Sequence, residues 1–279
     1  LLAFAGRLSV GCDWRPLLFQ QFHDILPGTS IPEVFDQAEP IWRRARRQAR
    51  HQRDQGLRQL LGMDSGSGAS STWLWMGWQP LARWSPLLKL PHGAWNADGA
   101  ALPQQPSVQG GTWVQLPEQR GICSVALSDG PVDSGEIAPR HPVSVVQVSP
   151  EIWRVSNGLV EFECSPVGLL QLRDAQGVDQ LSAPLRPCRY RDRGEFWDAW
   201  DIAADYRRHP LELEPVGSVQ LLESGPLVAQ LVVTYRVGAS RMRLDLRLKA
   251  DCPWLELIVS VDWCQRHELL RLDIPLAST

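Results

Sequence analysis

Two adjacent polar residues, His23 and Asp24, interrupt an otherwise apolar stretch that ends at Pro27-Gly28. A neutral imidazole is a common zinc ligand, and a neighbouring carboxylate can hydrogen-bond to it or to a hydroxylated ligand. A zinc site needs three or four ligands, and no second ligand stands at metal-binding spacing from His23. The residues alone therefore leave two interpretations open, a satisfied structural histidine and a ligand completed by groups from elsewhere.

Positive charge is concentrated between residues 40 and 61. Seven arginines and the single acid Asp54 give this segment a local charge of +6; the arginines are at positions 43, 44, 46, 47, 50, 53 and 58. Such a helix could bind phosphates. Runs of charge on amphipathic helices usually face solvent, and the rest of the chain has no nucleic-acid motif, so we expect a solvated outer face.

Helical spacing of apolar residues predicts how these groups are positioned. One stripe of a first helix is formed by Trp14, Leu17, Leu18, Phe22 and Ile25, and Pro27-Gly28 should end that helix. A second helix should begin with a capping box, in which the Ser30 hydroxyl accepts a hydrogen bond from the Glu33 amide. It is predicted to run to Leu61, with a kink at Pro40 and with Gly62 as its C-terminal stop.

Beyond residue 62 the sequence changes from helical to strand character. Residues 63–72 are rich in Gly and Ser and are interpreted as a linker. Apolar residues then alternate with period two in 159–164, 242–248 and 255–263, and Asn157-Gly158 predicts a hairpin with a type I′ turn. We therefore expect a helical segment over 1–62 and a large antiparallel β-sandwich over 73–279, an α+β multidomain protein in which 91–111 forms a surface loop.

Composition limits the class of protein. The 279 residues are 44% apolar and 21% charged, with a net charge of −3, which is typical of a soluble globular chain of about two domains. No apolar run reaches the length of a membrane span, and the chain begins with Leu, which suggests a piece of something longer. The six cysteines form no CxxC or CxxH pair, so neither a zinc knuckle nor an oxidising compartment is indicated.

Three blocks of sequence resemble glycoside hydrolase family 38, the α-mannosidases, of the cytosolic and bacterial type. Residues 21–30, QFHDILPGTS, match the family signature; residues 196–202, FWDAWDI, are similar to its WDAWDI block; and residues 261–271 resemble its DWxERHxxLK stretch. The blocks follow the family order over nearly the whole chain. Two departures stand in the last block, where Gln265 replaces the usual Glu and Arg271 the usual Lys.

The resemblance implies a parent enzyme with an N-terminal α/β barrel, a three-helix middle domain and β-sandwich domains. This chain would cover part of the helical domain and a sandwich resembling galactose mutarotase. In the family, zinc is bound by an upstream His-x-Asp pair, an upstream Asp and the His of the FHD motif, so His23 would be a metal ligand. The zinc holds two mannose hydroxyls, which Asp24 would contact. Hydrolysis with retention uses two carboxylates, both in the barrel.

Because the barrel would precede residue 1, we expect that this chain alone neither hydrolyses mannosides nor binds zinc tightly. Asp198 and Asp201, beside Trp197 and Trp200, either line the outer sugar site as substrate-binding residues or cap backbone amides in a packed loop. The expected partner is a mannose-containing oligosaccharide, with no nucleic acid and no membrane, in the cytoplasm. Oligomerisation, an assembly role through the Arg-rich helix and a free-standing carbohydrate-binding module remain open alternatives.

Overall fold

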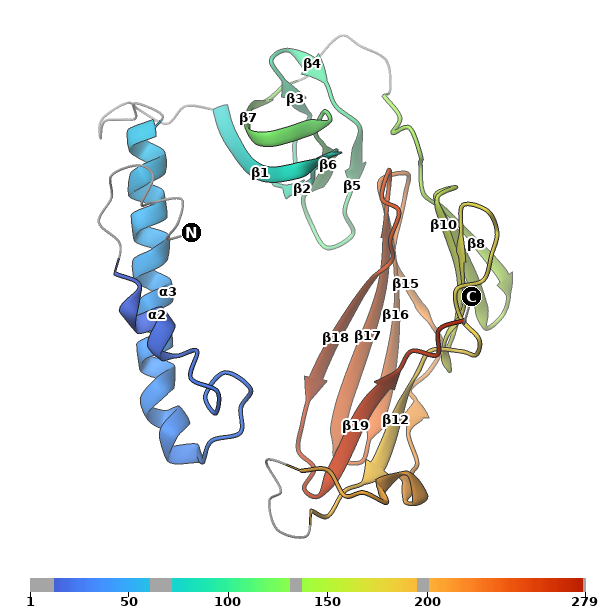
Figure 1. The fold of residues 1–279 in the computed structure, drawn as a ribbon. Helices are drawn as coiled ribbons and strands as arrows, with labels where there is room; N and C mark the ends of the chain where they lie inside the picture. Colours follow the sequence, from blue (N-terminus) through green and yellow to red (C-terminus); the bar gives the residue numbers. More distant parts are fainter. Residues whose placement is uncertain (1–12, 61–71, 131–136, 195–200, 278–279) are drawn as a thin grey trace. The chain divides into compact units, whose positions relative to one another are not determined.

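The computed structural model describes residues 13–60, 72–130, 137–194 and 201–277. The chain divides into two compact units, one of Leu1–Ser70 with Gly194–Ala203 and the other of Ser71–Arg193 with Ala204–Thr279. Figure 1 shows helices in the first unit and antiparallel strands in the second. A helical segment followed by antiparallel β-sheets is confirmed, while the three-helix arrangement and the mutarotase likeness stay predictions. No helix in the described ranges is long and apolar enough to span a bilayer.

The first predicted helix is wrong beyond its first turns. Helix α2 spans only Arg15–Phe19. The next amides, those of Gln21 and Phe22, bond three residues back instead of four, so the chain coils through turns. Of the predicted apolar stripe only Ile25 is buried. Phe, His and Asp are weaker helix formers than Leu or Gln, and the Asp24 carbonyl is taken by the amides of Thr29 and Ser30 rather than by a continuing helix.

The second predicted helix is confirmed, with a different start. Helix α3 spans Pro32–Leu60 and continues through Pro40. The predicted capping box is wrong, because the Ser30 hydroxyl donates to the Asp24 carbonyl at 2.9 Å and Pro32 is the first helical residue. Proline suits that position since its fixed φ is helical and its missing N–H would have no partner there. The predicted stop Gly62 and residues 63–71 of the predicted linker 63–72 lie outside the described residues, and Thr72 is the first residue of a strand, β1.

Residues 72–130 form a small β fold of two sheets. One sheet has the order β1-β7-β3-β4 and the other β2-β6-β5. Their bounds are β1 Thr72–Trp84, β2 Leu87–Leu90, β3 Trp95–Ala97, β4 Ala100–Ala101, β5 Gln104–Pro106, β6 Thr112–Gln115 and β7 Gln119–Asp129. The predicted surface loop 91–111 is therefore wrong. Its Gly residues make tight turns with positive φ at Gly99, Gly110 and Gly111, while Trp95 and Leu102 are buried in the core.

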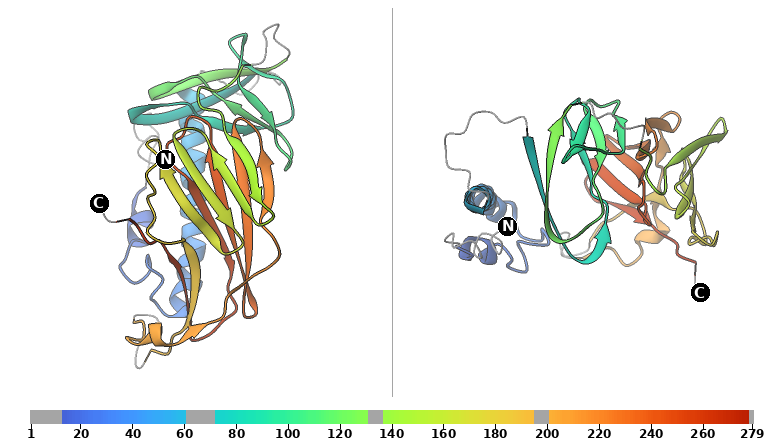
Figure 2. Two further views of the ribbon diagram at one scale, coloured as in Figure 1. Left: turned by 90° about the vertical axis from the view of Figure 1, so that its right-hand side faces the viewer. Right: turned by 90° about the horizontal axis from the view of Figure 1, so that it is seen from above.

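The described residues between 144 and 273 form a larger antiparallel fold of three sheets. Their orders are β11-β10-β9-β8, β14-β16-β17-β18 with β15 on β16, and β13-β12-β19. The bounds are β8 Ser144–Ser149, β9 Ile152–Ser156, β10 Val160–Ser165, β11 Gly168–Asp174, β12 Arg186–Arg191, β13 Pro210–Leu211, β14 Glu214–Pro215, β15 Gln220–Ser224, β16 Val228–Val237, β17 Ser240–Lys249, β18 Glu256–Asp262 and β19 Glu268–Asp273, with a 3-10 turn, η1, at Tyr206–Arg208. One hydrophobic core joins Phe162 and Leu169 of the first sheet to Leu231 and Leu244 of the second, as expected of a sandwich. Figure 2 shows these sheets from two further sides.

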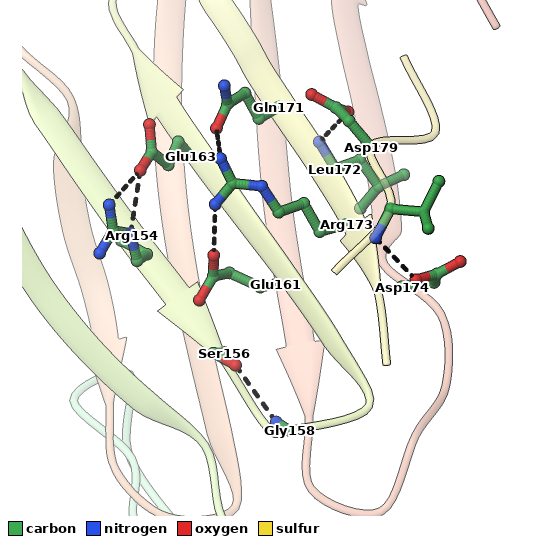
Figure 3. Close-up of polar contacts among 11 residues, drawn as sticks. Arg154, Ser156, Gly158, Glu161, Glu163, Gln171, Leu172, Arg173, Asp174 and Asp179 are labelled. Atoms are coloured by element: carbon green, nitrogen blue, oxygen red, sulfur yellow. Dashed lines mark hydrogen bonds and ion pairs between the residues drawn. The ribbon is translucent and has the colours of Figure 1, made fainter. Parts of the chain in front are cut away.

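The predicted alternation of strand residues is confirmed in β10 and β17. Met242, Leu244, Leu246 and Leu248 are all buried, with charged neighbours between them. The opposite face of β9–β11 is polar: Arg154 pairs with Glu163 at 2.6 Å and Arg173 with Glu161 at 2.8 Å (Figure 3). The two faces of this sheet therefore separate core from surface, as period-two patterning requires.

The Asn157-Gly158 hairpin between β9 and β10 is confirmed, but its predicted turn type is wrong. Only Gly158 of the pair has a positive φ, +78°, whereas a type I′ turn needs two. The buried Asn157 side chain instead organises the turn. Its Oδ1 accepts bonds from the amides of Leu159 and Val160, and its Nδ2 donates to the carbonyls of Lys249 and Cys252, all within 3.0 Å. Asn157 thus ties the hairpin to the turn after β17.

Side-chain amides join the small β fold to the sandwich. The Gln105 carboxamide accepts bonds from the amides of Leu227 and Val228, at 2.9 and 2.8 Å, and donates to the Val228 carbonyl at 3.0 Å. Asp251 accepts from the Gln115 side chain at 2.8 Å and from the His141 amide at 2.7 Å. The single domain predicted over 73–279 thus contains two hydrophobic clusters, and its small β fold is joined to the sandwich by these polar bonds and by Trp113, which belongs to the larger cluster.

Candidate functional site

The loop from residue 22 to residue 30 presents His23 and Asp24. Ile25 is buried and anchors the loop, and the Asp24 carbonyl accepts bonds from the amides of Thr29 and Ser30 at 3.2 and 3.0 Å. Gly28 has a φ of +86°, a left-handed conformation that favours glycine at this position. The buried Ile25, the left-handed Gly28 and the hydrogen bonds of Thr29 and Ser30 therefore close the loop. The side chains of His23 and Asp24 take no part in closing it.

The His23 ring is exposed. Its side chain is 75% accessible, and its Nε2 lies 3.5 Å from Asp24 Oδ2, whose side chain is 25% accessible. The ring of Phe22 packs beside it, with ring centroids 4.4 Å apart. A buried, satisfied structural histidine does not look like this. The geometry instead gives one accessible nitrogen and one carboxylate side by side.

This pair does not make a zinc site by itself. In the described part of the chain no group of three or more His, Cys, Asp or Glu side chains is arranged to hold a metal ion. Zinc in proteins takes at least three protein ligands, and His23 with Asp24 supplies at most two. Further ligands would have to come from outside the described residues.

Of the second predicted carboxylate cluster, only Asp201 lies within the described residues. Asp198, with Trp197 and Trp200, lies outside the described residues. Asp201 is exposed, and its carboxylate accepts a hydrogen bond from the Ile202 amide at 2.8 Å. That contact is the amide-capping geometry of the structural alternative. Among the described residues, no hydrogen bond or ion pair joins Asp201 to His23 or Asp24.

A polar cluster on β12, β19 and η1 was not predicted. Arg271 lies over the Tyr206 ring, 5.4 Å from its centroid, hydrogen-bonds to the Tyr206 hydroxyl and pairs with Asp273 at 2.9 Å. The Tyr190 and Tyr206 rings meet edge to face at 5.1 Å. In the sequence the only signal was Arg271 standing where the family usually has Lys. A guanidinium that stacks on a ring and pairs with a carboxylate uses geometry that an ammonium lacks.

Burial lowers the reactivity of three of the five cysteines in the described ranges. The five cysteines in the described ranges are free thiols. Burial raises the pKa of the Cys164 thiol to about 12, and burial also raises the pKa of Cys188 and Cys252. Thiols in this state are protonated at neutral pH and are poor nucleophiles.

Comparison with known proteins bears on the loop that carries His23 and on the sandwich. A family model described as "Alpha mannosidase middle domain" matches residues 9–60, and one described as "Glycosyl hydrolases family 38 C-terminal domain" matches residues 155–279. Alpha-mannosidase 2C1 of Mus musculus and of Homo sapiens are each 22% identical over 271 residues, covering 94% of this chain. The chain spans about a quarter of the length of these relatives, 24%. The two models match separate parts of the chain that carry the QFHDILPGTS and DWxxRH blocks, so the resemblance to glycosyl hydrolase family 38 is confirmed.

Proposed function

We propose that this chain is part of an α-mannosidase, a glycoside hydrolase that cleaves α-mannosides with retention, and that His23 supplies one zinc ligand. The observation that carries the proposal is the closed loop that exposes His23 beside Asp24. An accessible imidazole with a neighbouring carboxylate is suited to complete a metal site built mostly by other residues. When bound, zinc would hold sugar hydroxyls, and the proposed partner is a mannose-containing oligosaccharide.

In this proposal the residues of this chain bind and orient substrate. Asp24 accepts hydrogen bonds from sugar hydroxyls, while Asp198 and Asp201 line the outer part of the cleft. The two carboxylates that perform retaining hydrolysis, about 5–5.5 Å apart, would belong to other parts of the protein. We also propose a third helix beside α2 and α3, a sandwich of the galactose mutarotase type and a cytoplasmic location.

The test replaces His23 by Ala in the longest polypeptide that the gene encodes, with His51→Ala as the matched control. His51 is also an exposed histidine, and it lies on α3. We expect His23→Ala to lower both the zinc content and kcat/KM for an aryl α-mannoside by at least about a hundredfold, since loss of a metal ligand costs more than loss of its supporting groups. His51→Ala should leave both unchanged. Unchanged zinc content and activity in His23→Ala would overturn the proposal.

The chain of 279 residues provides a second comparison. Because its described residues supply too few ligands, we expect no turnover of the aryl α-mannoside and no zinc retained after dialysis. In the long form, Asp201→Asn tests the substrate role, and an unchanged kcat/KM would assign Asp201 to loop capping instead.

A carbohydrate-binding module without catalysis is the second candidate. Two indoles of the sandwich are exposed, Trp254 by 58% and Trp263 by 40%, and flat exposed rings can stack on sugars. Binding of the 279-residue chain to a glycan array that survives His23→Ala and is lost in Trp254→Ala would favour this candidate.

A further inference from the structure

A cavity of about 780 Å³ lies beside α2 and α3, and neither His23 nor Asp24 is among its lining residues. Two indoles, those of Trp14 and Trp42, contribute to its walls, together with leucine side chains. Small-molecule sites commonly measure roughly 300–1,000 Å³, with apolar and aromatic walls and a few polar groups. The size and the walls of this cavity suit such a ligand.

Four arginines of α3 line the cavity, and two of them lack a counter-ion. Arg43 pairs with Glu39 and Arg53 with Asp54, each at 2.6 Å. Arg46 and Arg50 form no ion pair within the described ranges. They stand one helical turn apart, so their side chains are neighbours on the same face. Two like charges on one wall repel each other unless an anion lies between them.

The carboxylates of the cavity wall do not supply that anion. Asp13 is held by Arg15 at 2.9 Å, and Glu39 is held by Arg43. The positive charge of Arg46 and Arg50 is therefore left over. It comes from the Arg-rich segment of the sequence, which the proposed mannosidase role does not use.

A buried carboxamide without partners lies in the same wall. Gln20 is 1% exposed, and neither its Nε2 nor its Oε1 has a hydrogen-bond partner. By contrast, the half-buried Gln104 carboxamide both donates to and accepts from the Trp95 backbone, at 2.8 Å. Buried polar groups are normally paired, so an unused carboxamide beside a cavity points to a polar group that arrives with a ligand.

We propose that this cavity is a binding site for a small organic phosphate. Arg46 and Arg50 bind the phosphate, because planar guanidiniums form paired, charge-assisted bonds with its oxygens and two of them match its two charges. The body of the ligand packs on Trp14 and Trp42, and a hydroxyl or amide of that body bonds to Gln20. The site is independent of the proposed mannosidase role.

Isothermal titration calorimetry on the 279-residue chain tests the proposal with three probes: inorganic phosphate, glucose 6-phosphate and AMP. Glucose and adenosine are the uncharged controls. We expect one or both phosphate esters to bind, and the uncharged controls not to bind. Comparing the affinities for glucose 6-phosphate and for AMP distinguishes a sugar phosphate from a nucleotide as the class of ligand.

The variant Arg46→Gln/Arg50→Gln should weaken ester binding by about tenfold or more, as expected for loss of charge-assisted bonds. Its matched control is Arg44→Gln/Arg47→Gln, which removes the same charge from the same helix outside the cavity wall. The control should change the affinity by less than about threefold, the usual effect of a distant surface charge. Equal weakening by the two double variants would show non-specific charge attraction and overturn the proposal.

The variant Gln20→Leu should raise Tm, because it removes an unpaired buried polar group, and it should also weaken ester binding. A raised Tm with unchanged binding would remove Gln20 from the site. No binding of any ester at 10 mM, a limit set at about the weakest measurable affinity, would overturn the proposal. Binding of hexaglutamate in place of the esters would overturn it in favour of an acidic polypeptide partner.

Discussion

Replacing Asn157 by Ala tests how the sandwich is held together. The Asn157 carboxamide uses its full hydrogen-bonding capacity: two bonds accepted from Leu159 and Val160 and two donated to Lys249 and Cys252, at 2.8–3.0 Å. Each buried bond contributes about 1 kcal/mol net, so four give about 4 kcal/mol. A water entering the vacated space would recover part of this, and we therefore expect a loss of about 3 kcal/mol.

The assay is equilibrium unfolding in guanidinium chloride, with the denaturation midpoint and slope fitted to the transition of the β unit. The matched control is Ser156→Ala in the same hairpin, where the Ser156 hydroxyl accepts a bond from the exposed Gly158 amide at 3.2 Å (Figure 3). That solvent-accessible bond should contribute less than about 0.5 kcal/mol. If the free energies of unfolding of the two variants agree within about 1 kcal/mol, the Asn157 bonds are not what joins the hairpin to the turn after β17.

Two further variants probe ionisable groups of the sandwich. Tyr235 is buried with no partner for its hydroxyl, so Tyr235→Phe should raise the free energy of unfolding by about 1 kcal/mol in chemical denaturation; a decrease would reveal a bridging water. Burial raises the pKa of Glu256, but bonds and charges from Lys249 and Arg247 outweigh it and hold the pKa below 4.5. The stability that this ionised carboxylate contributes is present above pH 4.5 and is lost as the pH falls through the folded-state pKa. Glu256→Gln should therefore make the free energy of unfolding less dependent on pH below 4.5. An unchanged pH profile of stability would contradict this.

Strand β17 and helix α3 could be predicted from the sequence. Strand β17 carries a regular apolar period and formed where that period placed it, and helix α3 runs to Leu60, close to its predicted end at Leu61, although its predicted capping box was wrong. The prediction of a long first helix was wrong because its apolar stripe finds little to pack against inside its own unit.

The prediction of a surface loop over 91–111 was also wrong. Its prolines and glycines indicated a loop, whereas they form turns between short strands that bury Trp95.

Candidate site residues that are neighbours in the sequence could be predicted, whereas those brought together only by the fold could not. His23 and Asp24 were found because one continuous motif contains both and builds the loop that exposes them. The cluster of Tyr190, Tyr206 and Arg271 was missed, because it exists only once β12 pairs with β19, a contact between distant positions. Gln20 and Tyr235 were missed for a related reason, since the lack of a partner is a property of three-dimensional packing.

The hydrogen bonds that Gln105 makes to the sandwich have a consequence for how this protein can evolve. The carboxamide recognises main-chain atoms of Leu227 and Val228, which every non-proline amino acid would present in the same way. Substitution of Leu227 or Val228 therefore leaves these three bonds intact and needs no compensating change at Gln105. The evolutionary constraint is one-sided at this contact and rests on Gln105, whereas the side-chain bond between Gln115 and Asp251 constrains both folds.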